Sequence, residues 1–287
     1  MLRRSKLGEH MDNTFDKLYY SRGENVAGID ESGVSDIAGP LVAACVILPK
    51  LTPEIEDLRI FSIDDCKKIP EKYRRDHVAV IWEISDAIGI GEVVPMEIDF
   101  LGKRKATILA MVRAIANCQD KKKRAVEPDF LMIDGNIPLP VNIEQECIKD
   151  GDCASLSIAA ASLVAKVWRD DTMASLHRSY PHYDWIRNKG HPCEKHFRGI
   201  DNRGIVPGVH RTRFWPFVAN KERRDDEKFW DVRRGLWRTR SLENLIAESL
   251  GQEKILTDHF SKQLEYSQKT RRQKKFEKDG NNSKKDT

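Results

Sequence analysis

Four acidic residues stand at the ends of short apolar runs or just before a run of small residues. Asp30, Glu31 and Asp134 follow apolar runs, and Asp152 precedes the small-residue segment. In α/β sheets, site residues gather beyond the strand ends. Carboxylates brought together there repel one another unless cations neutralise them, and Mg²⁺ and Mn²⁺ prefer all-oxygen ligands. The pattern therefore indicates a site for two divalent cations, which together activate water for phosphodiester hydrolysis.

Each acid also has an ordinary structural explanation. The pair Asp30-Glu31 suits a turn after a strand, and Asp134-Gly135-Asn136 suits a β-turn. Asp152 suits the N-cap of the following helix. Only the four acids taken together favour the metal site. Asp170 is left out, because an unbroken helix would carry it about 27 Å from Asp152.

Alternating apolar runs and helical spacing predict the elements that position these acids. We expect an α/β fold in which the first two strands form a hairpin. The expected strands are 26–31, 41–48, 88–94, 130–133 and 147–149, and the expected helices are 98–118 and 154–169. In the second helix, Ala159–Ser162 places small residues where the backbone can approach the sheet closely.

The composition excludes several classes of protein. The chain has 287 residues, 40% hydrophobic and 33% charged, which excludes collagen, a coiled-coil rod and a fully disordered chain. The apolar run 37–48 is too short to span a bilayer, and the first 25 residues carry no signal-peptide pattern. The six cysteines form no Cys-x-x-Cys pair, which indicates free thiols in a reducing, cytoplasmic compartment. We expect no zinc site and no membrane partner.

Charge and composition divide the chain into three parts. Residues 221–287 hold 18 Lys+Arg and 13 Asp+Glu, a net charge of +5, whereas residues 1–220 carry a net charge of −1. We expect residues 1–24 to be a flexible leader and residues 25–220 to form the domain that carries the acids. Residues 221–287 are expected to be a basic extension, partly helical and then disordered.

An ordered series of motifs resembles the ribonuclease HII family over roughly residues 25–217. The motifs are Ala27–Glu31, Ala38–Pro40, Asp65–Lys68, Glu97–Asp99, Ile133–Asn136, Gly151-Asp152, Ser157–Ser162, Ala165–Val167, Arg169-Asp170, Lys189-Gly190 and His210-Arg211. The resemblance implies a ribonuclease H-like mixed β-sheet flanked by helices and followed by a helical C-terminal part.

The resemblance also implies an activity and its cofactors. It implies an endonuclease that cuts the RNA strand of RNA–DNA hybrids, or DNA duplexes containing ribonucleotides, and leaves 3′-hydroxyl and 5′-phosphate ends. The family's metal ligands fall on Asp30, Glu31, Asp134 and Asp152, the acids already singled out. Two divalent cations, Mg²⁺ or Mn²⁺, and a monomer are expected.

The segments that read the substrate depart from the family. Its Gly-Arg-Gly stretch is Gly33-Val34-Ser35 here, and its Lys-Gly-Tyr is Lys189-Gly190-His191. Val34 has no guanidinium for phosphate, and the family's tyrosine reads the 2′-hydroxyl that distinguishes RNA from DNA. The expected substrate-binding residues are Gly33, Val34, Ser35, Lys189, His191 and Arg211, with Arg213 as a further phosphate contact and Lys166 as a structural residue. We predict retained metal binding and a weakened preference for single ribonucleotides.

Two other functions remain open at this point. Val34 and His191 favour a catalytically weakened nucleic-acid-binding protein of the same fold, although four retained acids without metals would repel nucleic acid. A different nuclease on a ribonuclease H-like fold is the third possibility. The ordered small-residue and Lys-Gly motifs oppose it.

Overall fold

The computed structural model describes residues 14–23, 25–50 and 69–213. The motif Asp65–Lys68 and the extension 221–287 lie outside the described residues. Five strands form one sheet in the order β3-β2-β1-β4-β5. They are β1 (Val26–Ser32), β2 (Leu41–Ile47), β3 (Ala87–Val93), β4 (Phe130–Asp134) and β5 (Glu144–Ile148).

The sheet is mixed, as expected. β1 pairs antiparallel with β2, which confirms the predicted hairpin, and β2 pairs antiparallel with β3. On its other side β1 runs parallel to β4, and β4 runs parallel to β5. The last strand begins at Glu144 rather than Cys147. β1 therefore lies at the centre, and its carboxyl end points the same way as that of β4.

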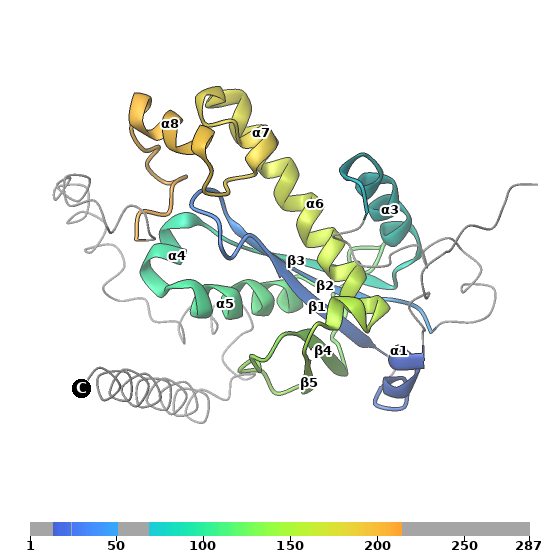
Figure 1. Ribbon diagram of the computed structural model, residues 1–287. Helices are drawn as coiled ribbons and strands as arrows, with labels where there is room; N and C mark the ends of the chain where they lie inside the picture. The colour runs from blue at the N-terminus through green and yellow to red at the C-terminus, as the bar shows by residue number, and fades with distance from the viewer. Residues whose placement is uncertain (1–13, 24, 51–68, 214–287) are drawn as a thin grey trace, which may run out of the picture.

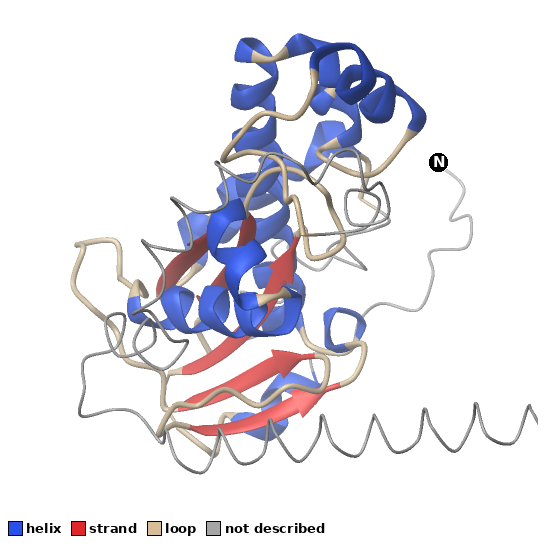
Figure 2. Cartoon of the chain, turned by 90° about the vertical axis from the view of Figure 1, so that its left-hand side faces the viewer, coloured by secondary structure: helices blue, strands red, loops and turns tan. Residues whose placement is uncertain are grey.

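Helices cover both faces of the sheet (Figures 1 and 2). β2 shows why, because every one of its residues is buried. Leu41, Ala43 and Cys45 belong to the core that contains α5 (Lys103–Ala116), whereas Val42 and Ala44 belong to the core that contains α6 (Leu156–Ser179). A strand alternates its side chains between two faces, so continuous apolar sequence here means two covered faces. The helix α3 (Glu71–Ile84), not predicted from sequence, packs against α6.

The small residues of α6 do bring its backbone close to the sheet. A Cβ on Gly28 of β1 would lie 2.1 Å from the Ser157 carbonyl carbon. On the opposite face a Cβ on Gly91 would lie 1.9 Å from the Ala110 oxygen of α5. The predicted end of this helix at residue 169 is wrong, since α6 continues to Ser179. Glycines thus open the sheet to close helix contact on both sides.

The predicted single helix over 98–118 is two helices. α4 (Pro95–Leu101) ends and α5 begins at Gly102, whose φ is 78° and ψ is 160°. A positive φ is accessible to glycine at little energetic cost. The apolar spacing continues across this break, so periodicity alone did not reveal it.

The expected flexible leader 1–24 is corrected over residues 14–23. Thr14–Tyr19 form the helix α1, and Tyr19 stacks on Phe130 of β4 with ring centroids 5.3 Å apart. Asp16 of α1 is fully buried and lies against the first residues of α6. Its carboxylate accepts hydrogen bonds from the Leu156 and Ser157 amides at 2.8 and 3.1 Å. These amides have no partner within the helix, so α1 supplies their acceptor, beside the N-cap residue Ser155 of α6.

Replacing Asp16 with Ala should destabilise the protein by about 1–3 kcal/mol, because it removes a buried charged acceptor from two amides. The matched control is Leu18→Ala on the same helix, since Leu18 is 63% exposed. Urea unfolding of both variants measures the difference. Equal stabilities of the two variants would show that α1 does not cap α6.

A small helical lobe sits beyond the end of α6 (Figure 1). It contains α7 (Trp185–Asn188) and α8 (Glu194–Arg203), with the short turn η3 (Pro181–Tyr183) before them. Its core includes Trp185, Ile200 and Met173, and it also takes in Ile37 from the β1–β2 connection. That connection is thereby held against the lobe. In the described ranges, no helix has the length and apolarity needed to cross a bilayer.

Candidate active site

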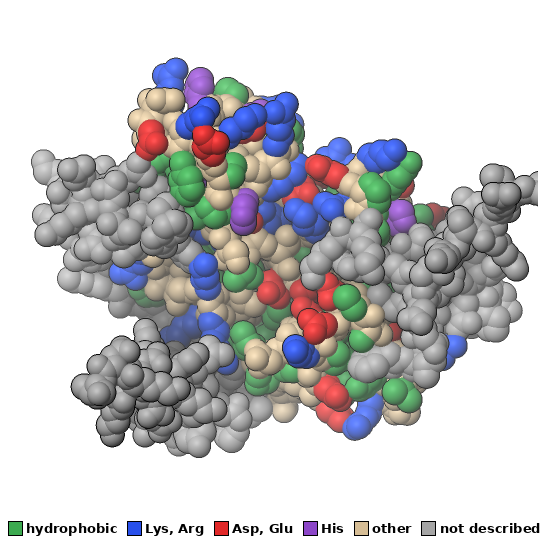
Figure 3. All heavy atoms as spheres, viewed as in Figure 1, with side chains coloured by type: hydrophobic (Ala, Val, Ile, Leu, Met, Phe, Trp, Pro, Cys, Tyr) green, Lys and Arg blue, Asp and Glu red, His purple; other side chains and the backbone are tan. Residues whose placement is uncertain are grey.

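Three of the predicted acids meet at one edge of the sheet. Ile29 pairs with Ile133 where β1 and β4 run parallel, so the next residues, Asp30 and Asp134, are neighbours across the two strands. Glu31 follows Asp30 on β1. In the space-filling view acidic side chains gather near the centre of this face, with Lys and Arg side chains above them (Figure 3). The parallel pairing therefore produces the acidic edge.

The short turn that carries Asp152 contacts this edge. It lies in η2 (Gly151–Cys153), after β5, and is 4% exposed. The preceding Gly151 amide donates to the Asp134 carboxylate at 2.7 Å. The alternative role of Asp152 as an N-cap is excluded, because Ser155 caps α6 by accepting from the Ile158 amide. Asp152 is therefore buried at a position before the N-cap of α6.

Burial and mutual repulsion raise the pKa of two of these carboxylates, Asp30 and Glu31. Burial and then the neighbouring Glu31 raise the pKa of Asp30 well above its usual range, while a hydrogen bond from Ser162 opposes the shift. Burial and then Asp134 raise the pKa of Glu31 to about 7. A positive ion at this edge would relieve both causes, because it compensates for lost hydration and screens like charges.

The acids are close, but they do not form a closed cage. Among the described residues, no three or more His, Cys, Asp or Glu side chains are grouped so that they could hold a metal ion as they stand. Mg²⁺ is commonly bound by one or two carboxylates together with water and substrate phosphates rather than by a protein cage. An all-oxygen, buried and mutually repelling set fits that kind of site.

A groove of about 450 Å³ opens beside Glu31. It collects both segments that were expected to read the substrate, although they are more than 150 residues apart in sequence. The residues that line it are Glu31, Ser32, Gly33, Val34, Ser35, Asp36, Lys166, Arg169, Asn188, Lys189 and His191. Five of the six predicted substrate-binding residues therefore face one groove next to the acidic edge.

His191 contacts Asp36, which forms an ion pair with Arg169. Its Nδ1 lies 3.3 Å from Asp36 Oδ1, and Asp36 Oδ2 lies 2.9 Å from Arg169. Arg169 is 1% exposed and donates to the carbonyls of Ala38 and Pro40. The exposed imidazole is thus held by a carboxylate that is itself held by a buried guanidinium.

A sequence model of the ribonuclease HII family matches residues 27–216, two thirds of the chain. The chain belongs to the ribonuclease HII family.

Solved structures share the ribonuclease HII fold with this chain. Ribonuclease H2 from Pyrococcus horikoshii OT3 matches with a TM-score of 0.58 and 21% identity, covering 70% of this chain and 100% of that chain. The RNase HII in a PCNA complex from Archaeoglobus fulgidus matches with a TM-score of 0.53 and 21% identity, covering 66% and 95%. A mutant of Bst-RNase HIII matches with a TM-score of 0.56 and 19% identity, covering 68% and 69%. At these identities the likeness shows the fold.

One predicted contact of this ribonuclease HII family member is wrong. Arg211 was expected to bind phosphate, but its side chain is fully buried. It donates instead to backbone carbonyls of the β1–β2 connection, including those of Gly33 and Pro40. A guanidinium enclosed in this way does not reach a phosphate in the groove, so Arg211 is a structural residue.

Two lysines of the groove have partners already. Lys189 forms an ion pair with Glu71 at 2.9 Å, and Lys166 forms one with Asp170 at 2.6 Å. Sequence reasoning treated Lys166 as structural and missed that it lines the groove. The helical spacing could have indicated this position, because Lys166 follows Ser162 by one helical turn and therefore lies on the same face of α6. Ser162 forms a hydrogen bond with Asp30.

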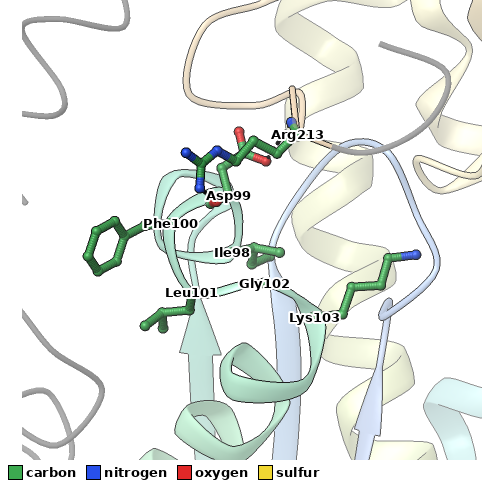
Figure 4. Close-up of a pocket in the computed structure, with 7 residues that line it drawn as sticks. All are labelled: Ile98, Asp99, Phe100, Leu101, Gly102, Lys103 and Arg213. Atoms are coloured by element: carbon green, nitrogen blue, oxygen red, sulfur yellow. Dashed lines mark hydrogen bonds between the residues drawn. The ribbon is translucent and has the colours of Figure 1, made fainter. Parts of the chain in front are cut away.

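A second open cavity of about 480 Å³ lies at the break between α4 and α5 (Figure 4). Arg213 lies at this cavity and donates to the Asp99 carbonyl at 3.2 Å. Phe100 points outward and is 40% exposed, while Lys103 points to the other side (Figure 4). None of the four acids lines this cavity. The phosphate contact predicted for Arg213 stays a prediction.

Proposed function

We propose that this protein is a divalent-cation-dependent endonuclease that hydrolyses the RNA strand of RNA–DNA hybrids and leaves 3′-hydroxyl and 5′-phosphate ends. One observation carries the proposal: Glu31, at the acidic edge of β1 and β4, lines the groove formed with residues 33–36 and 188–191. Membership of the ribonuclease HII family supports the same activity. A duplex seated in the groove would bring its backbone to the acids.

Asp30, Glu31, Asp134 and Asp152 are the residues that would hold the cations. When bound, Mg²⁺ or Mn²⁺ would supply an activated water and stabilisation of the leaving oxygen. A structure of Bst-RNase HIII contains Mn²⁺, which supports divalent-cation use in proteins of this fold. The Gly151 amide keeps the Asp134 carboxylate in place at 2.7 Å, and the Ser162 hydrogen bond does the same for Asp30.

The remaining groove residues bind and orient the duplex. Lys166 and Lys189 place positive charge beside Glu31, where a phosphodiester would lie. Such contacts position a duplex without reading its sequence. His191, fixed through Asp36, offers its Nε2 to the sugar or the phosphate. RNA is distinguished from DNA at such a site through the 2′-hydroxyl.

The test uses four duplexes with Mg²⁺ or Mn²⁺: DNA, RNA, a continuous RNA–DNA hybrid, and DNA with one ribonucleotide. The expected result is cleavage of the hybrid's RNA strand, lost in Asp134→Asn. Binding of the hybrid without cleavage by the wild type would favour the catalytically weakened binding protein instead, a role that Val34 and His191 would suit. Cutting of plain DNA would show a different nuclease.

The substitutions in the groove predict a shifted substrate preference. Val34 packs part of its side chain against the core and offers no donor to phosphate. We expect the hybrid to be cut at least about tenfold faster than the single ribonucleotide, the equivalent of one lost charged hydrogen bond. Introducing Val34→Arg together with His191→Tyr should raise the relative rate at the single ribonucleotide.

The matched control is Val80→Arg, which adds the same charge at a position 38% exposed on α3. It should leave the ratio of the two rates unchanged. Equal wild-type rates on the two substrates would contradict the prediction, and so would an unchanged ratio in the double variant.

A further inference from the structure

Three separate segments of the chain meet beside the groove. We call residues 36–39, 188–191 and 206–211 the groove frame. The Ile37 amide donates to the Gly190 carbonyl at 3.0 Å, and the Arg211 amide donates to the Ile37 carbonyl at 2.8 Å. The Gly39 amide donates to the Val209 carbonyl at 2.8 Å. Residues 37–39 therefore lie between the other two segments, as a middle strand does.

Arg211 ties the first wall of the groove to this frame. Its guanidinium is fully buried and donates only to backbone carbonyls of residues 33–40. The bonds to Gly33, Asp36 and Pro40 are 2.6, 3.0 and 2.8 Å long. A lysine has one ammonium in place of this fork of donors, so no other cation could satisfy the same set of carbonyls. The conformation of residues 33–36 depends on Arg211.

A buried histidine pair holds the second wall. His196 Nδ1 lies 3.0 Å from the His191 carbonyl, and its Nε2 lies 3.2 Å from His210 Nε2. His210 Nδ1 accepts from the Val206 amide at 2.8 Å. These partners require a proton on His196 Nδ1 and on His210 Nε2, so His210 donates to His196 and both rings are neutral. His210 directly precedes Arg211, and His196 holds the backbone of His191.

We propose that Arg211 is a positioning residue for the groove, and that the His196–His210 pair keeps it and His191 in register so that both walls move as one unit. The expected effect on substrate binding rests on the proposed function. The positioning role itself rests on the contacts within the groove frame and does not require catalysis.

The surroundings of the pair favour its neutral form. Burial and then His196 lower the pKa of His210 to about 3, and burial lowers the pKa of His196. Asp36 attracts a positive charge on His196, whereas His191 opposes it.

The helical lobe packs Tyr183 and Trp185 against the histidine pair, and the Trp185 indole N–H donates to His196. In the lobe, burial raises the pKa of Tyr183, and the charge of Arg203 opposes this rise. In the groove frame, burial and then the charge of Arg169 lower the pKa of Arg211. Two facing N–H groups would result if either ring were protonated.

Hydrogen exchange of the full chain at pH 7.5 tests the positioning role. Arg211→Lys should raise the opening of residues 33–40 and of residues 188–191 together, by at least tenfold, and leave 158–165 of α6 unchanged. Arg198→Lys, an exposed arginine of α8, is the matched control. An equal rise in the α6 core would show general instability and overturn the proposal. A rise confined to residues 33–40 would overturn the coupling of the walls.

The wild type provides a second measurement if Arg211→Lys does not fold. An opened frame exposes histidines with an ordinary pKa near 6.5, so acid favours opening and protection falls as the pH falls. For one histidine the protection factor should drop about thirtyfold between pH 7.5 and 5 in both walls, before the α6 core changes. Unchanged protection in the walls at pH 5 would overturn the role of the pair.

Cleavage separates this inference from the proposed function. If the wild type cuts the hybrid, Arg211→Lys should raise the KM for it at least tenfold and keep the stabilisation by Mn²⁺, since the acids are untouched. A fall in kcat alone would contradict positioning. If the wild type cuts none of the four duplexes, the proposed function fails, and the exchange of the two walls still decides the role of Arg211.

Discussion

Glu31→Gln is expected to abolish cleavage while making the cation-free protein more stable. The pKa of Glu31 is raised to about 7 by burial and by Asp134, from an ordinary value of 4.5. The folded state then binds more protons than the unfolded state between these values, so stability falls as the pH rises from 4.5 through 7. At pH 8 the buried charge costs about 1–3 kcal/mol. Glutamine removes this charge and keeps the shape.

Activity should change in the opposite sense. A ligand lost from a two-cation site removes several kcal/mol of transition-state stabilisation, so the rate should fall at least about 10³-fold. Thermal melting at pH 8 with a chelator should show a higher Tm for Glu31→Gln than for the wild type. Adding Mn²⁺ should raise the Tm of the wild type more than that of the variant.

Glu83→Gln is the matched control, because Glu83 is exposed on α3. It should alter neither the Tm difference nor the cleavage rate. A variant at Glu31 that is less stable than the wild type in chelator would mean that the acids do not repel one another. Equal stabilisation of both proteins by Mn²⁺ would remove Glu31 from the ligands.

Gly28→Ala should give one of the largest losses of stability of any single methyl group added to the sheet. The new Cβ would lie 2.1 Å from the Ser157 carbonyl carbon and 2.4 Å from the Ile158 nitrogen, which are backbone atoms of α6. Neither can move without shifting the helix. Overpacking of this kind costs about 3 kcal/mol or more. Because Asp30 is two residues along the same strand, the shift should also reduce cleavage.

Gly208→Ala separates this clash from backbone strain. Gly208 has a φ of +82°, and a Cβ there meets nothing within 4 Å. It should cost only about 1–2 kcal/mol, the penalty for a left-handed conformation. Urea unfolding of both variants gives the comparison. A Gly28→Ala protein as stable as Gly208→Ala would show that α6 does not rest on β1.

The sequence allowed the acidic edge to be predicted because each acid follows a recognisable strand or turn. The parallel register of Ile29 with Ile133 then places Asp30 beside Asp134, which no local pattern could show. Positions whose role depends on distant partners were missed. Asp16 lies in a polar stretch without periodicity, and its partners are 140 or so residues away in α6.

The sequence analysis identified five residues that line the groove, but it misjudged Arg211, which supports the groove. Departures from the family motif identified Val34 and His191, and the structure brings both to one groove. Arg211 was expected to bind the substrate, whereas its side chain is fully buried, which is rare for arginine. Its burial depends on carbonyls that converge from a loop far away in sequence, including those of Gly39 and Pro40. A motif shows that such a residue matters without showing where its side chain lies.

The order of the strands also bears on how the fold is assembled. β1, β2 and β3 follow one another as a meander, whereas β1 meets β4 only by joining residues about a hundred positions apart, as Ile29 meets Ile133. Closing the longer loop costs more chain entropy, and contacts of long sequence separation form slowly. The acidic edge is therefore built on the most demanding contact of the sheet. We therefore expect nascent or partly opened chains to form the meander with α5 before Asp30 and Asp134 are brought together.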